Sequence, residues 1–202
     1  MSEAVSTAAP DARGASRPRH MPGEEGIWLF IFGDMMVFTL FFIVFAWARS
    51  EQLELYRESQ HHLSQFFGAL NTFFMLTSSW CVATAVRASR GGHRGITIAG
   101  FCGGVACAIG FGINKYFEYG DKIRAGITPA TNDFFMYYYV FTGIHMMHVL
   151  IGMSVLAWMA NYARKVPVLD RPAVRNLESG ASFWHVVDLL WIVLFALLYL
   201  AP

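Results

Sequence analysis

Five long apolar runs, separated by short charged segments, dominate this sequence. They extend from Gly26 to Ala48, from Leu63 to Val86, from Gly95 to Asn114, from Phe134 to Ala163, and from Ser179 to the C-terminus. A helix needs about 20 mostly apolar residues to cross the hydrocarbon core of a bilayer, and each run has roughly that length. The pattern therefore predicts an all-α integral membrane bundle of five transmembrane helices.

The composition agrees with a membrane protein rather than with a soluble domain. Of the 202 residues, 55% are hydrophobic and only 14% are charged, a balance that suits lipid better than water. The net charge of +1 points neither to nucleic acid nor to an acidic partner, so we expect no nucleic acid to bind. Cys81, Cys102 and Cys107 lie singly inside apolar runs, without a CxxC pair. We expect them to be buried thiols and to form no metal site.

The segments outside the runs predict the organisation and the orientation of the chain. Residues 1–24 are rich in Ala, Ser, Pro and Arg, so we expect a disordered tail there and a five-helix domain over residues 25–202. Lys115 to Asp133 is the longest connection, and we expect it to form turns. With the N-terminus inside, ten Lys and Arg lie on the inner side and five on the outer side. This excess favours a cytoplasmic N-terminus and a periplasmic C-terminus in a bacterial inner membrane.

Small and aromatic residues predict how the spans pack and where they meet the interface. Gly100 and Gly104 form a GxxxG spacing, which is typical of close helix packing, although the same face could approach a lipid or a partner subunit. Amphipathic aromatic rings settle at the membrane interface. We expect this anchoring role for the aromatic residues near the span ends, namely Trp28, Trp47, Tyr116, Tyr119, Tyr137 and Tyr199.

Asp34 and Asp188 are the formally charged residues inside the predicted spans. An ionised carboxylate at the depth of Asp34 costs at least ~2.5 kcal/mol without a partner or water. Imidazoles in other spans are available as partners. His145 and His148 lie three residues apart, hence on one helix face, and His185 stands in the same relation to Asp188.

Three roles for these polar residues stay open on the residues alone. They bond one another across helices and so fix the packing of the bundle. Alternatively, Asp34 exchanges protons, because intramembrane acids often mark proton paths. In the third role the histidines bind haem or a metal, which for haem requires matched depths on two helices. We expect His185 near the entry of its helix and His145 farther in, which argues against that use.

Four strings, in order along the chain, resemble subunit III of the haem-copper oxidases. Leu70-Asn71-Thr72 fits the family's Leu-Asn-Thr, and Glu118-Tyr119 fits its Glu-Tyr. Residues 143–152, with His145 and His148, are similar to the family's penultimate helix. The last run matches the family's Trp-His-Phe-Val-Asp-Val-Val-Trp string at Trp184, His185, Val187, Asp188 and Trp191. The resemblance covers residues 25–202 and adds Asn71 and Glu118 to the polar candidates.

The resemblance implies a non-catalytic subunit that itself binds no cofactor and has no catalytic residue. It places haem, with copper or non-haem iron, in a partner, the catalytic subunit of a haem-copper oxidase or nitric oxide reductase. Membrane lipids are the other partners that it implies. Asp34 stands where the family's oxidases carry a carbodiimide-reactive glutamate, so a proton role with a shorter side chain is also implied.

The short form of the chain points to one branch of the family. Mitochondrial-type subunit III has seven helices, and this chain resembles the last five. This short form and the strings Pro22 to Trp28 and Gly33 to Met35 are similar to the NorE-type branch, which is associated with nitric oxide reductase and denitrification. We therefore expect an accessory protein that supports assembly, stability and proton supply in respiratory electron transport. The alternatives are an oxidase subunit III proper and, from another class, an independent membrane cytochrome or a proton-linked transporter.

Overall fold

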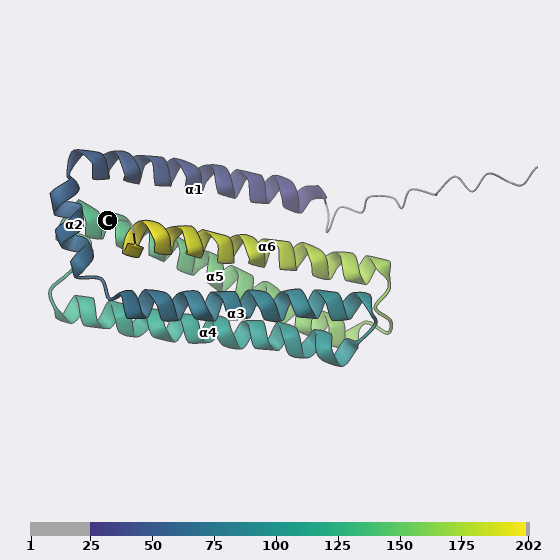
Figure 1. The fold of residues 1–202 in the computed structure, drawn as a ribbon. Helices are drawn as coiled ribbons and strands as arrows, with labels where there is room; N and C mark the ends of the chain where they lie inside the picture. The colour runs from purple at the N-terminus through teal and green to yellow at the C-terminus, as the bar shows by residue number, and fades with distance from the viewer. Residues whose placement is uncertain (1–24, 201–202) are drawn as a thin grey trace, which may run out of the picture.

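The computed structural model describes residues 25–200, which form helices and short connections without a strand (Figure 1). The expected tail at residues 1–24 lies outside the described residues. In order, the elements are α1 (Glu25–Glu51), α2 (Leu53–His61), α3 (Gln65–Arg90), α4 (Arg94–Arg124), α5 (Asp133–Lys165), α6 (Arg171–Phe195) and the π-helical turn η1 (Ala196–Leu200). Within this range five helices, all except the short α2, are long and apolar enough to cross a membrane, α6 being counted together with η1. This confirms the predicted all-α bundle.

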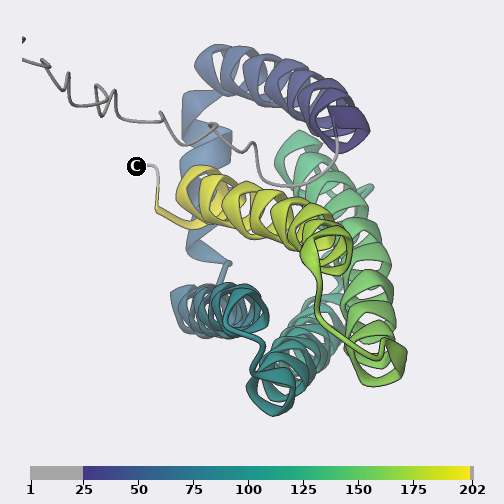
Figure 2. The same ribbon diagram turned by 90° about the vertical axis from the view of Figure 1, so that its right-hand side faces the viewer.

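The long helices run side by side, and α6 lies among the others (Figures 1 and 2). Seen along the helices, α1, α3 and α5 surround α6, while α4 packs against α3 and α5 (Figure 2). Burial follows this arrangement. In the most apolar window of each helix, 50% of the α6 residues but only 17% of the α1 residues are buried. The structure thus has a packed part, α3 to α6, and a loosely attached helix, α1.

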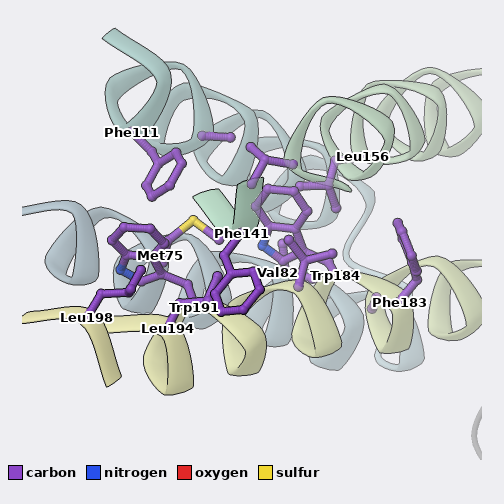
Figure 3. Close-up of a cluster of buried hydrophobic side chains, with 14 of the residues drawn as sticks. Met75, Val82, Phe111, Phe141, Leu156, Phe183, Trp184, Trp191, Leu194 and Leu198 are labelled. Atoms are coloured by element: carbon purple, nitrogen blue, oxygen red, sulfur yellow. The ribbon is translucent and has the colours of Figure 1, made fainter. Parts of the chain in front are cut away.

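Large side chains from the packed helices meet in one core (Figure 3). Trp191 of α6 stands edge-on to Phe111 of α4, with ring centroids 4.8 Å apart. Trp184 lies against Gly152 of α5, where an added Cβ would come within 2.6 Å of the indole ring. Both tryptophans are fully buried. The core therefore fixes α6 against α5 and toward α4 by shape as well as by apolar burial.

Close contact between α3 and α4 depends on the predicted GxxxG spacing. A Cβ on Gly100 would lie 2.7 Å from the Cβ of Ala85, and one on Gly104 would lie 3.0 Å from Val82. The Ser78 hydroxyl also donates to the Gly104 carbonyl at 3.0 Å. The two glycines thus face α3, which confirms the prediction of close helix packing and assigns the neighbour.

Two predicted helix boundaries were wrong. The third span does not end at Asn114, because α4 continues to Arg124 and the chain turns only at Gly126, whose φ of +77° is a left-handed conformation that glycine adopts readily. The last span begins before Ser179, since α6 starts at Arg171 with the Asp170 side chain accepting from the Ala173 amide. In both places the prediction ends the span next to a charged residue. A charge does not break a helix; it only requires a partner.

The short helix α2, between the first two spans, was not predicted. Its Tyr56 ring is buried between Phe45 of α1 and Phe134 of α5, and this burial raises the pKa of the tyrosine to about 12. Ser59 of α2 accepts a hydrogen bond from Asn132, whose own side chain caps α5. Helix α2 therefore ties the end of α1 to the beginning of α5.

Candidate functional site

Asp34 of α1 and His148 of α5 meet between their helices. The Oδ1 atom of Asp34 lies 3.1 Å from Nε2 of His148, and both side chains are nearly buried, at 13% and 10% exposed. The other ring nitrogen, Nδ1, lies 2.8 Å from the backbone carbonyl of Ile144. Phe38 of α1 packs edge-on to the imidazole. Of the three candidate imidazoles, the structure therefore brings His148 to Asp34.

The hydrogen bonds of this pair determine how many protons it holds. A backbone carbonyl can only accept, so the Nδ1 atom of His148 carries a hydrogen. The contact between Nε2 and Asp34 then requires one further proton, on the imidazole or on the carboxyl group. Either way the pair has no net charge, which suits its position in a membrane span. The Oδ2 atom of Asp34 has no hydrogen-bond partner among the described residues, so the pair is incompletely satisfied.

A second polar group, the Lys115 cluster, consists of Lys115, Glu118, Lys122, Tyr138 and Tyr199. The Lys115 amine donates to Oε2 of Glu118 at 2.9 Å, and the Lys122 amine lies 3.6 Å from Oε1. The side chains of Lys115 and Glu118 are each 1% exposed. These three residues of α4 were placed in a connection by sequence, which was wrong, because they are buried in the packed part of the bundle.

Tyrosines from the other helices complete the Lys115 cluster. The hydroxyls of Tyr138 and Tyr199 donate to Oε1 of Glu118 at 2.9 and 2.6 Å. The same hydroxyls accept from Lys115 at 3.1 and 3.0 Å. The Lys115 amine also lies 4.9 Å from the centroid of the Tyr138 ring and 5.2 Å from that of Trp191, within the range of cation–π attraction. Every bond in this cluster crosses between helices or follows one helix face.

The tyrosines predicted to anchor at the interface fall into different places. Tyr199 is 2% exposed and belongs to the Lys115 cluster, so its ring packs inside the bundle and does not serve as an anchor on the outer surface. Tyr119 is half-buried, with its hydroxyl 2.5 Å from that of Thr142. Tyr116 is 77% exposed, as an anchoring residue would be. The spacing of Lys115, Glu118 and Lys122, which puts all three on one helix face, was the signal that could have found the cluster.

A third polar group lies between α3 and α6. The Nδ1 atom of His185 is 2.8 Å from the Ser79 hydroxyl and 3.6 Å from Oδ2 of Asp188. Asp188 is 3% exposed, whereas the His185 side chain is 39% exposed. The predicted pairing of His185 with Asp188 is present. His185 lies halfway along the 30-residue span, so its expected position near the helix entry was wrong.

The remaining candidates, Asn71 and His145, differ in how they are bonded. Asn71 of α3 accepts from the Asn114 amide of α4 at 2.8 Å, which links these helices. His145 is fully buried between Phe111 and Trp191, and neither ring nitrogen has a hydrogen-bond partner within residues 25–200. The structure therefore does not bring His145 to Asp34. In the same range no three His, Cys, Asp or Glu side chains are grouped as metal ligands.

Comparison with known proteins gives a family for this arrangement. The family model described as cytochrome c oxidase subunit III matches residues 16–201. Among similar proteins, cytochrome c oxidase subunit 3 of Synechocystis sp. is 28% identical over 177 residues, which cover 87% of this chain and 74% of that protein. Cytochrome bo(3) ubiquinol oxidase subunit 3 of Pseudomonas putida is 27% identical over 87% of this chain and 84% of its own length.

A longer relative matches through part of its length. Heme-copper oxidase subunit I+III of Aeropyrum pernix is 24% identical over 184 residues, which cover 88% of this chain and 22% of that protein. The chain thus spans about a fifth of that relative. The match over residues 16–201 includes all five spans and the three polar groups between them. The chain is a multi-pass membrane protein and belongs to the cytochrome c oxidase subunit III family, the subunit III family of the haem-copper oxidases.

Proposed function

We propose that this chain is a non-catalytic membrane subunit that docks on the haem-bearing catalytic subunit of a respiratory complex. In this proposal residues 25–202 form one membrane domain in a bacterial inner membrane, with the N-terminus in the cytoplasm and the C-terminus in the periplasm. Haem, with copper or non-haem iron, belongs to the catalytic partner. The role of the chain is to support the assembly, stability and proton supply of that partner.

The observation that carries the proposal is the use of the family's motif residues within the bundle. Glu118 joins α4 to α5 and η1 through its two tyrosines, Asn71 joins α3 to α4, and His185 joins α6 to α3. Side chains that bond one another across helices fix the packing of a membrane bundle. Their chemistry is thereby used in holding a scaffold together.

Asp34 and His148 support a further part of this role, the supply of protons. The contact between Nε2 of His148 and Oδ1 of Asp34 contains one proton, and the pair has no net charge whichever partner holds it. It also joins the loosely attached α1 to α5 rather than lying in the packed core. We infer that Asp34 exchanges this proton in step with the catalytic partner, and that it keeps this ability with a side chain shorter than glutamate.

For the partner we favour a nitric oxide reductase, with this chain as a NorE-type accessory protein. The strings Pro22 to Trp28 and Gly33 to Met35 support this choice. The names of the similar proteins favour the second candidate, subunit III of a cytochrome c or quinol oxidase. The two candidates predict the same docking and differ in the substrate that the complex reduces.

Purification of the tagged full chain from its native membranes in mild detergent tests both the docking on a haem-bearing subunit and the choice of that partner. We expect a haem-bearing subunit to co-purify, and the complex to consume nitric oxide faster than oxygen. Oxygen consumption alone would assign the oxidase branch instead. A reduced-minus-oxidised haem spectrum that stays with the chain after the subunits are separated would indicate an independent cytochrome. Isolation of the chain without any haem protein would overturn the docking proposal.

A further inference from the structure

The outer side of α6 carries a regular stripe of residues, which we call the α6 stripe: Ser182, His185, Leu189, Ile192 and Ala196. Successive members are separated alternately by three and four positions. Leu189 and Ile192 are 47% and 39% exposed. On the opposite side of the helix, Trp184, Val187 and Trp191 are fully buried. The most deeply packed helix of the bundle therefore leaves one face uncovered.

The position of this face in the bundle is visible along the helix axes (Figure 2). Helices α1, α5 and α3 surround α6, and no long helix of residues 25–200 runs along the remaining side, between α1 and α3. The short α2 crosses from α1 to α3 at one end. The exposed Leu189 and Ile192 show that the α6 stripe is the part of α6 that these helices leave uncovered.

The spacing of the stripe is that of a helix–helix seam. Apolar residues that recur every 3.5 positions keep facing a second helix over several turns, as positions a and d of a heptad do. The stripe keeps this spacing from Ser182 to Ala196. Because one face of any α-helix shows this spacing, it fits a second helix without excluding lipid, and the polar residue within the stripe decides between the two.

His185 gives the stripe a polar centre. Its Nδ1 atom is engaged by Ser79 at 2.8 Å, whereas no hydrogen bond within the described residues involves Nε2. Beside it the buried Asp188 has no hydrogen bond to either carboxylate oxygen in residues 25–200. His185 lies halfway along the span, so lipid headgroups are about 15 Å away, half the thickness of the hydrocarbon core. Hydrocarbon cannot satisfy an imidazole at that depth, but a side chain from a neighbouring helix can.

We propose that one transmembrane helix of the haem-bearing catalytic subunit lies along the α6 stripe, and that a hydrogen-bonding side chain of that helix meets the Nε2 atom of His185 within the membrane. The identity of the partner rests on the proposed function, whereas the place of the contact follows from the stripe. A single polar residue within an otherwise apolar seam sets the register of two helices. His185 is thus a positioning residue for the docked helix.

Photocrosslinking in the native membrane tests the place of the contact. A photoreactive residue is put at Leu189 of the full chain and, as a matched control, at Ile151 of α5, since both side chains are 47% exposed. We expect Leu189 to crosslink to a transmembrane peptide of the haem-bearing subunit and Ile151 to crosslink to lipid. Crosslinks from Leu189 to lipid alone, or to a second copy of this chain, would overturn the inference.

Variants measure the strength of the contact. Leu189→Trp puts bulk on the stripe without entering the core, and we expect it to lower the yield of co-purified haem at least tenfold, with Ile151→Trp unchanged. His185→Leu should lower the yield about threefold, as expected for one interhelical hydrogen bond, and more than Ser79→Ala does, which breaks the same bond between α3 and α6 but leaves the Nε2 atom in place. Normal haem yield with Leu189→Trp would overturn this inference and leave the proposed function standing. Failure of the unmodified chain to co-purify with haem would instead overturn the proposed function.

Discussion

The Lys115 cluster and the Asp34–His148 pair are both buried polar groups, yet the structure treats them differently. In the Lys115 cluster two amines and two hydroxyls surround one carboxylate, and side chains from three elements of the packed bundle take part. In the pair one imidazole meets one carboxyl oxygen, and the other oxygen has no partner in the described chain. The polar atoms of the cluster satisfy one another, whereas the pair leaves one carboxyl oxygen without a hydrogen bond among the described residues.

We infer from this difference that the Lys115 cluster has a structural role, whereas the Asp34–His148 pair has the proposed role in proton exchange. A carboxylate that is held by four neighbours can neither move nor take up a proton without breaking several bonds, so it stabilises the packing. A carboxyl group that shares one proton with one imidazole can change its protonation with little rearrangement. The loose packing of α1, 17% buried in its apolar window, adds to that freedom. The comparison predicts that variants in the two regions differ in kind as well as in size.

The largest effect should come from Glu118→Gln. Loss of the carboxylate leaves Lys115 and Lys122 without their counter-charge inside the bundle, and breaking a buried ion pair costs about 3–5 kcal/mol. Thermal unfolding of the purified chain in detergent measures this loss. The double variant Lys115→Met/Glu118→Gln should be destabilised by less than the sum of its single variants, because the two side chains are coupled. A single variant that melts like the unmodified protein would contradict the structural role of the cluster.

Gly152→Ala should have the next largest effect. The added methyl group would lie 2.6 Å from the ring of Trp184, and overpacking of a core costs about 1–3 kcal/mol. Gly143→Ala, on the same helix, and Gly33→Ala, on α1, are matched controls, since a Cβ at either position meets nothing within 4 Å. Unfolding curves should shift for Gly152→Ala alone. Equal shifts for all three variants would show that the packed part and α1 do not differ in packing.

His148→Leu should destabilise the chain by about 1 kcal/mol. The change removes the hydrogen bond to Asp34 and leaves that carboxyl group buried without a partner. The loss should be concentrated in α1, which hydrogen exchange of its backbone amides can detect next to an unchanged α4. Unaltered exchange in α1 together with unaltered thermal stability would argue against the pairing of Asp34 with His148.

Asp34→Asn should have the smallest effect on stability, within about 0.5 kcal/mol, because an amide can keep a hydrogen bond to the imidazole. Its effect should instead appear in function. The variant no longer offers an exchangeable carboxyl proton, so the turnover of the co-purified catalytic subunit should change its dependence on pH. The test is a turnover–pH profile measured beside that of Asp34→Glu, which we expect to resemble the unmodified protein. Profiles that coincide for Asp34→Asn and the unmodified chain would reject the proton role.

Part of the candidate site could be predicted from the sequence, because some signals are local. The pairing of His185 with Asp188 follows from a spacing of three residues on a helix. The need of Asp34 for a partner follows from its depth in a span. The choice of His148 over His145 could not be predicted, because both lie on neighbouring parts of one helix face. That choice depends on which side of α5 meets α1.

The Lys115 cluster shows where sequence reasoning fails. A hydropathy pattern takes a lysine as the end of a span, since an unpaired charge in lipid is costly. Tyr138 and Tyr199 remove that cost by donating to the carboxylate beside the lysine, and they lie 20 and 81 residues from Glu118 along the chain. Only the packing of α5 and η1 against α4 brings these groups together.

By itself, the sequence determined that the chain crosses a membrane as five helices, because long apolar runs must satisfy their backbone within each helix in lipid. It also determined the family, through short strings that match those of the family in the same order. The tertiary structure decided which polar groups meet: Asp34 with His148, Glu118 with Tyr138 and Tyr199, and His185 with Ser79. The physical reason is that a buried polar side chain is defined by its neighbours, and those neighbours come from different helices.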